Sequence, residues 1–272
     1  MRTIAIAGQK SGSGKTTTVR CLGAVLAKEY GQRLLLVDVD PQADLSTSCE
    51  VEGEGASLAE VLNGSVSVSD VLVKIAPHVQ LLPSDITLAH AELSFFRKPQ
   101  AGQAPMENEI KRVLETVADE FDIALLDLPS SLGLLTVNGL VAAQEVLIPA
   151  RPEFIELRAL ALLVETLNNI KQGLNSVLMN PDLVVAGILP TFYNSKLRHH
   201  GEITAAWQAT GLPLLGVRVM DSPRHVEALL ASKPITNYNP ENPIIQAYQR
   251  AADIIIQGLG TTDWELGLED KE

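Results

Sequence analysis

The chain has 272 residues, with 21 lysines and arginines against 33 aspartates and glutamates, so its formal net charge is −12. That charge argues against a protein whose whole surface binds nucleic acid or an anionic membrane, although local basic patches stay possible. The two cysteines, Cys21 and Cys49, form no C-x-x-C pair, which disfavours a disulfide scaffold or a zinc site and suits a reducing cytosol.

Short apolar runs recur along the chain, and each precedes a stretch with helical spacing. Runs without polar alternation are typical of parallel strands that helices cover on both faces. The predicted strands are Thr3–Ala7, Arg33–Val39, Val79–Leu82, Ile123–Leu128, Glu145–Ala150, Leu183–Leu189 and Leu214–Val217. Among the helices, Lys15–Tyr30 is predicted to end at Gly31, and Ser57 and Glu60 have capping-box spacing.

This alternation predicts an α/β fold with a doubly wound, mostly parallel sheet flanked by helices. We expect one domain over residues 1–260. Residues 261–272 carry five acidic side chains against a single lysine, so we expect an acidic, flexible tail there.

The segment Gly8–Thr17, GQKSGSGKTT, lies directly after the first predicted strand and opens the first helix. Glycines in such a loop let backbone N–H groups turn toward phosphate oxygens, and the helix N-terminus adds the positive end of its dipole. Lys15 supplies a point charge, and the Thr16 hydroxyl is a typical ligand of Mg²⁺. The segment therefore predicts a phosphate loop that binds ATP with magnesium; the alternative is a glycine-rich turn with two surface lysines.

The loop departs from the ordinary Walker pattern in two ways. That pattern has a glycine five places before Gly14, where this chain has Gln9. In addition, Lys10 places a second lysine at the start of the loop.

Three aspartates follow predicted strands. Asp38 and Asp40 lie in the sequence VDVDPQ, and Asp127 lies in LLDLP. Ligands of open α/β sheets bind at the carboxyl ends of the strands, and carboxylates there can hold the hydration shell of magnesium and position a water for attack. Each aspartate alone could cap a helix, but together with the phosphate loop they predict a hydrolytic site.

These residues resemble the ParA/MinD family of deviant-Walker ATPases, and its ParA branch in particular. The matching segments are Lys10–Thr17, Asp38–Gln42, Phe121–Asn138, Val146–Phe154, Gly187–Tyr193 and Pro234–Tyr248, so the likeness spans most of the chain. The resemblance implies a P-loop fold, slow basal ATP hydrolysis, and a homodimer with two ATP molecules sandwiched at its interface.

The resemblance also implies roles for individual residues. The implied nucleotide site consists of Lys10, Ser11, Gly12, Ser13, Gly14, Lys15, Thr16, Thr17 and Glu153. Lys10 of each subunit is expected to reach the partner's phosphates. The implied metal site consists of Thr16, Asp38 and Asp127, the two aspartates through water. Asp40 is expected to orient the attacking water, with Lys10 and Lys15 as the other catalytic residues.

Three matches leave questions open. Pro129–Gly133 resembles the switch segment that senses the γ-phosphate, but Ser130 replaces a second proline, which loosens the loop. Ser11 replaces a glycine, which is tolerable where φ is negative and then alters rates without loss of binding. Glu153 is matched to a glutamate that helps to fix the partner subunit or its nucleotide, although it could equally be an exposed glutamate at a helix start.

For cellular function the resemblance implies a cytoplasmic positioning ATPase that is nucleoid-associated in its ATP state. Its dimer would bind DNA without sequence preference and distribute a plasmid, a chromosome or a protein organelle, while a ParB-like or adaptor protein stimulates hydrolysis. The candidate DNA contacts are Lys196, Arg198, Arg218 and Arg224. Lysine and arginine contacts to phosphate give salt-sensitive, sequence-independent binding, and the alternative for each is an ordinary solvated charge.

Three other functions would need different sequence features. A MinD-like membrane-surface ATPase needs a basic amphipathic C-terminal helix, whereas Asp263–Asp270 is acidic, and no run of 18 apolar residues occurs. An iron–sulfur carrier needs cysteines that can hold a cluster, and neither Cys21 nor Cys49 is placed for that. A binding module without turnover stays an alternative that phosphate release would separate, although the retention of both Asp40 and Lys10 favours turnover.

Overall fold

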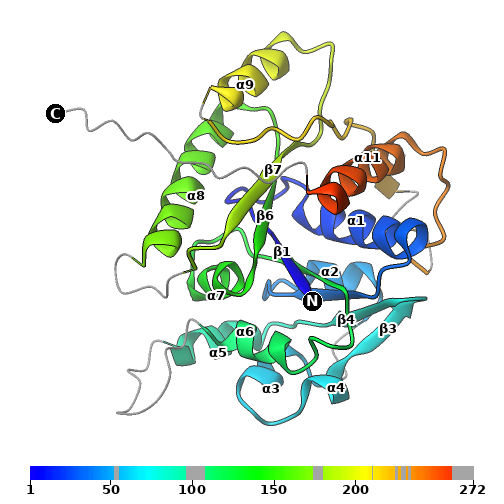
Figure 1. The fold of residues 1–272 in the computed structure, drawn as a ribbon, viewed down its shortest axis with the longest axis vertical. Coiled ribbons are helices and arrows are strands. Elements are labelled where there is room, and N and C mark those ends of the chain that lie inside the picture. The colour runs from blue at the N-terminus through cyan, green and yellow to red at the C-terminus, as the bar shows by residue number, and fades with distance from the viewer. Residues whose placement is uncertain are drawn as a thin grey trace.

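A computed structural model of the chain describes residues 1–51, 55–95, 108–173, 180–209, 211–223, 226–227, 231 and 234–258. Its centre is a seven-stranded sheet in the order β3-β4-β2-β5-β1-β6-β7, with helices on both faces (Figure 1). The strands are β1 Arg2–Ile6, β2 Leu34–Asp38, β3 Val73–Ala76, β4 Val79–Leu82, β5 Ile123–Asp127, β6 Glu145–Ala150 and β7 Val184–Pro190. Neighbouring strands pair in parallel, except for antiparallel β3 and β4.

The helices bury their apolar faces against the two sides of this sheet. They are α1 Lys15–Tyr30, α2 Asp44–Ser48, α3 Leu58–Leu62, α4 Val68–Val71, α5 Leu88–Phe95, α6 Glu109–Glu115, α7 Leu134–Ala142, α8 Phe154–Gln172, α9 Arg198–Gln208 and α11 Pro243–Gln257. Alternate residues of β2 face opposite sides of the sheet. Leu35 packs in the hydrophobic cluster that contains residues of α7 and α8, and Leu36 packs in the cluster that contains residues of α1 and α11. Both sides of the central strands are therefore buried, as their continuous apolar runs predict.

Most predicted elements are confirmed. Six of the predicted strands occur with boundary shifts of at most one residue. Helix α1 has the predicted bounds and ends at Gly31, whose φ of 64° is in the left-handed region. Helix α3 has the predicted capping box, in which Ser57 and Glu60 exchange hydrogen bonds with each other's backbone N–H groups.

The structure corrects two details of the sheet. The segment Leu214–Val217 is not a strand, because Leu214 makes only an isolated bridge to Ile188 and the Val217 N–H turns back to the Leu215 carbonyl at 2.6 Å. Conversely, β3 was not predicted. It is a four-residue edge strand that joins β4 through a tight turn at His78, whose φ is 62°.

The C-terminal helix α11 lies alongside α1, the helix that follows the phosphate loop (Figure 1). The buried hydroxyls of Thr18 and Tyr248 join the two helices at 2.9 Å. On its other side α1 lies close to β2, since a Cβ at Gly23 would come within 2.9 Å of Leu36. Helix α1 is thus held between the sheet and α11.

The predicted domain ends at residue 260, after which the predicted tail begins. The predicted tail at 261–272 lies outside the described residues, and the single domain over 1–260 stays a prediction. Over the described ranges, none of the helices is both long enough and apolar enough to span a bilayer.

Candidate active site

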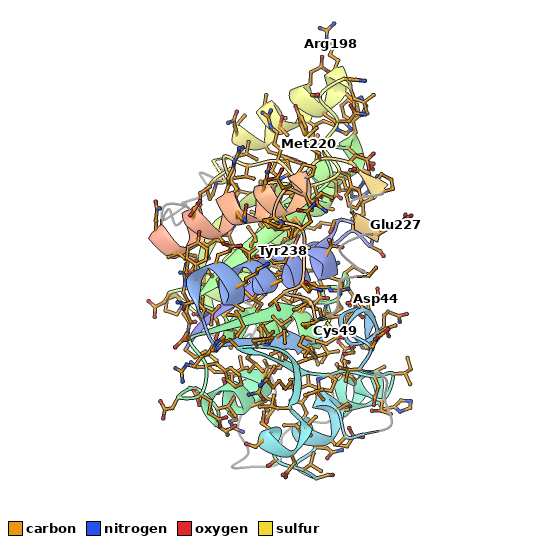
Figure 2. The ribbon with its side chains drawn as sticks, turned by 90° about the vertical axis from the view of Figure 1, so that its right-hand side faces the viewer. Asp44, Cys49, Arg198, Met220, Glu227 and Tyr238 are labelled. Atoms are coloured by element: carbon orange, nitrogen blue, oxygen red, sulfur yellow. The ribbon has the colours of Figure 1, made fainter. Side chains whose placement is uncertain are left out.

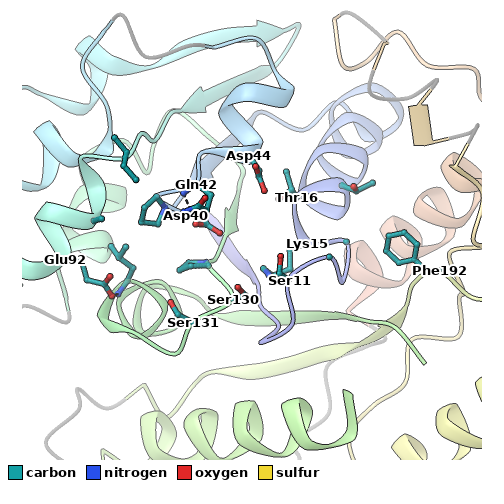
Figure 3. A pocket seen from close by; sticks show the side chains of 18 residues that line it. Ser11, Lys15, Thr16, Asp40, Gln42, Asp44, Glu92, Ser130, Ser131 and Phe192 are labelled. Carbon is teal, nitrogen blue, oxygen red and sulfur yellow. Dashed lines mark hydrogen bonds between the residues drawn. The ribbon is translucent and has the colours of Figure 1, made fainter. Parts of the chain in front are cut away.

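A pocket of about 520 Å³ opens at the carboxyl ends of β1, β2 and β5 (Figure 3). Segments far apart in the sequence line it: the phosphate loop, the loop between β2 and α2, the beginning of α5, and the segment that follows β5. Its lining residues include Gly12, Gly14, Lys15, Thr16, Thr17, Asp40, Asp44, Glu92, Ser130 and Phe192. The strand register brings the predicted carboxylates together, because Asp38 and Asp127 are direct partners on β2 and β5.

The phosphate loop has the conformation that its glycines allow. Gly12 and Gly14 have φ values of 76° and 91°, in the left-handed region that side-chain-bearing residues avoid. Ser11 has no positive φ, so the serine fits the loop, as predicted. The side chain of Ser13 is buried and does not line the pocket, while its carbonyl accepts a hydrogen bond of 2.7 Å from Thr191 after β7.

The ammonium group of Lys15 lies at this pocket and is almost fully buried. Loss of water on burial lowers its pKa, and the attraction of Asp127 and Asp40 opposes that shift. A desolvated cation that faces a pocket is suited to bind an anion.

Asp127 is buried at the end of β5, beside the pocket. Both of its carboxylate oxygens are buried, and within the described residues neither has a hydrogen-bond partner. Burial raises its pKa, and Asp38 raises it further; the Thr16 hydroxyl lies close enough to oppose the shift without meeting hydrogen-bond geometry. An unpartnered buried carboxylate beside a threonine hydroxyl fits a hydrated magnesium ion.

Asp38, by contrast, has its oxygens occupied. It accepts hydrogen bonds from the N–H of Ser46 at 2.8 Å, from the Ser46 hydroxyl at 2.7 Å and from the N–H of Asp40 at 3.2 Å. Burial raises its pKa to about 6, although these bonds favour the charged form. Asp38 therefore holds the loop between β2 and α2 in place, and its contact with water around the metal stays a prediction.

Asp40 lies on that loop, half-buried, with its carboxylate at the same pocket as Lys15 and Ser130 (Figure 3). One of its oxygens accepts the N–H of Gln42 at 2.9 Å. The structure thus places Asp40 beside the space that a nucleotide phosphate would fill, as its predicted role requires.

Lys10 does not line the pocket of its own chain. Its ammonium group donates to Glu153, and Arg151 lies 3.4 Å from the same carboxylate. The hydrogen bond from Lys10 lowers the pKa of Glu153. Behind this pair lies the buried Glu156, whose pKa is raised by burial. In the single chain, then, Lys10 is folded back onto the start of α8.

Three of the four candidate DNA contacts are described, and all three are exposed: Lys196, Arg198 and Arg218. Arg198 projects from the end of the molecule that α9 forms, where it pairs with Glu202 at 2.9 Å (Figure 2). The guanidinium group of Arg218 lies over the ring of Tyr193, 4.6 Å from its centre. Arg224 lies outside the described residues.

Sequence reasoning missed several pocket residues, among them Asp44, Phe192 and Glu92. Phe192 has a left-handed φ of 48° and lies close to Gly14, with Arg151 over its ring at 4.5 Å. Its position within a family-like motif, GILPTFY, was the available signal. Glu92 reaches the pocket from α5, and no local pattern marks it.

Several known proteins are similar to this chain over most of its length. A protein-family model described as an AAA domain matches residues 1–180. An uncharacterised protein of Mycobacterium tuberculosis is 36% identical over 264 residues, which cover 95% of this chain and 80% of that protein. The chromosome-partitioning ATPase Soj of Treponema pallidum is 33% identical over 261 residues, covering 94% of this chain and 97% of Soj.

Among solved structures, cobyrinic acid a,c-diamide synthase from Mycobacterium smegmatis with bound ADP and magnesium has a TM-score of 0.81 and 33% identity, and 95% of each chain is covered. The region that the family model matches contains the phosphate loop, Asp38, Asp40, Asp127 and the segment after β5. The chain therefore belongs to the ParA/MinD family of ATPases, which includes the Soj proteins.

Proposed function

We propose that this ATPase binds ATP with magnesium in the pocket at β1, β2 and β5, and that two chains close around two nucleotides. In that state the dimer binds DNA without sequence preference and positions a cargo, which is a plasmid, a chromosome or a protein organelle. A ParB-like or adaptor protein stimulates hydrolysis and so releases the DNA. The protein is then cytoplasmic, and nucleoid-associated while ATP is bound.

The observation that carries the proposal is the charge of the pocket. Among the described residues that line it, Lys15 is the only cation, whereas Asp40, Asp44 and Glu92 are acidic. A triphosphate needs more positive charge than one lysine, a helix dipole and one magnesium ion supply when the walls are acidic. Lys10 of a second chain provides a further cation of the kind that this pocket lacks.

The residues of one chain have different roles toward the bound nucleotide. Magnesium, when bound, offsets phosphate charge and polarises the phosphoryl oxygens. Thr16 and Asp127 would hold it, while the backbone of residues 11–17 and Lys15 hold the phosphates. Asp40 accepts a hydrogen bond from the attacking water and aims it at the γ-phosphate.

The surface next to Lys10 supports the shared site. Phe154 and Ile155, the first residues of α8, are 68% and 65% exposed and directly follow Glu153. Large apolar side chains exposed side by side on a surface are typical of a surface that another protein covers. A second copy that brings Lys10 across the interface would cover them.

The exposed cations near α9 support the DNA-bound state. Lys196, Arg198 and Arg218 lie near one another in the fold, because the backbone of Tyr193 pairs with that of Val219 and Asp221. Phosphate contacts of this kind are individually weak, and a dimer doubles their number. The likeness to a chromosome-partitioning ATPase agrees with a function on DNA.

A DNA-binding titration tests the proposal. The protein is titrated with duplex DNA of unrelated sequences in the presence of ATP, ADP or no nucleotide, at about 50 and 200 mM salt. We expect binding with ATP only, weakened by salt and lost on Lys15→Ala, which removes the nucleotide. Arg218→Ala should weaken binding and reduce its salt dependence, whereas Lys111→Ala, at an exposed position of α6, should change neither. Equal binding in all three nucleotide states, or binding to anionic liposomes in place of DNA, would contradict the proposal.

A further inference from the structure

The helix that follows the switch segment begins without a cap of its own. Helix α7 starts after Gly133, which has no side chain to accept a hydrogen bond from the first N–H groups. An N-terminal turn normally takes such an acceptor from the residue at its N-cap. In this chain the acceptor comes from another helix: the Oε1 atom of Glu92, on α5, accepts the N–H of Leu135 at 3.2 Å.

The absence of a side chain at Gly133 is what makes room for this contact. A Cβ at that position would lie 2.3 Å from Oε1 of Glu92, closer than any real contact. The φ of Gly133 is −79°, so the glycine is not required for its backbone conformation. The fit between Glu92 and this turn is therefore one of space and of charge, since a carboxylate is also favoured by the helix dipole.

The turn that Glu92 holds is part of the pocket. Ser130 and Ser131 line it just before Gly133, and Glu92 lines it beside them (Figure 3). The Ser131 carbonyl is in turn held by the Thr136 hydroxyl at 2.6 Å. The switch segment is thus clamped between α5 and the first turn of α7, at the edge of the proposed γ-phosphate site.

We propose that Glu92 is the positioning residue that sets the switch segment for hydrolysis by capping α7 from α5. This proposal rests on the proposed function, because it assigns Ser130 and Ser131 a place beside the γ-phosphate. Glu92 acts through the backbone of the switch and not on the nucleotide. Its loss should misplace the switch and slow hydrolysis, since displacements near 1 Å at a reacting group cost up to a hundredfold in rate, while ATP binding through the phosphate loop persists.

Three variants address this contact from both sides. Glu92→Ala removes the acceptor, Glu92→Gln keeps an acceptor oxygen and removes the charge, and Gly133→Ala leaves Glu92 intact but fills the space that its Oε1 occupies. The matched control is Glu60→Ala, which removes another glutamate that accepts a backbone N–H at a helix start, away from the pocket. Each variant is measured for ATP affinity, for kcat and KM by phosphate release, and for thermal unfolding.

We expect Glu92→Ala and Gly133→Ala to lower kcat between about ten- and a hundredfold, with KM and ATP affinity within about threefold of the parent protein. Glu92→Gln should restore most of the rate, and Glu60→Ala should lower the melting temperature alone. Parental kcat in Glu92→Ala would overturn the proposal, as would a loss of activity that only follows the unfolded fraction, or a Glu92→Gln variant as slow as Glu92→Ala. A parent protein that releases no phosphate would instead refute the proposed function.

Discussion

Replacing Lys10 with alanine separates two roles of this side chain: the ion pair that it makes within one chain, and its proposed contact with the nucleotide of a partner chain. In the single chain Lys10 pairs with Glu153, and the two side chains are 28% and 36% exposed. Ion pairs this open to solvent contribute at most ~1 kcal/mol to folding, so the melting temperature without nucleotide should fall by no more than about 4 °C. Removing one preorganised cation from a charge-stabilised transition state instead costs on the order of 10²–10³ in kcat.

Light scattering after size exclusion, with ATP and with ADP, measures the dimer, and phosphate release measures turnover. Lys111→Ala, which removes an exposed lysine of α6, is the matched control and should behave like the parent protein. If Lys10→Ala forms the ATP dimer and hydrolyses ATP at the parental rate, the nucleotide is not shared between two chains. If its melting temperature falls much further than 4 °C, the argument from solvent screening is wrong.

Four further outcomes follow from the described contacts. Asp40→Ala should keep ATP and the dimer but release DNA far more slowly, which a competition assay measures; parental release would show that Asp40 does not orient the water. Ser57→Ala removes the capping box of α3 and should cost ~1 kcal/mol in urea unfolding. Trp207→Ala empties a fully buried site on α9 and should cost about 3–5 kcal/mol in the same assay. Burial raises the pKa of Asp38 from 3.8 to about 6, so the folded chain binds this proton more tightly than the unfolded chain does. The contribution of Asp38 to the free energy of unfolding therefore falls as the pH rises between those two values. Asp38→Asn should flatten that slope in the same urea assay.

The central strands could be predicted because their burial leaves no polar alternation. Every residue of β2 and β5 is buried, so each appears in the sequence as one apolar run that ends in an aspartate. β3 could not be predicted this way, since Lys74 at the edge of the sheet is exposed and the run is broken. For Leu214–Val217 the prediction failed in the opposite way, because the run is apolar but is not a strand. Its side chains pack in the core beside the sheet, and its backbone makes only an isolated bridge to β7.

The same distinction applies to the candidate site, where continuous segments could be predicted from the sequence and contacts between distant segments could not. The phosphate loop is one continuous segment, so its glycines, Lys15 and Thr16 could be assigned from spacing, and strand ends brought Asp40 and Asp127 to the same edge. Contacts between distant segments had no such signal. Lys10 and Glu153 are 143 residues apart, and Glu92 and Leu135 are 43 apart, with nothing periodic between them.

The packing of α11 on α1 has a consequence for how the molecule is made. The helix that follows the phosphate loop is synthesised among the first 30 residues, yet it packs against Tyr238 and against α11, which come much later in the chain. On a translating ribosome, where chains lengthen by about 5–20 residues per second, α1 waits for its cover for at least ten seconds or so. Helix α1 can therefore complete its packing only late in synthesis, after the segment that carries α11 has left the ribosome.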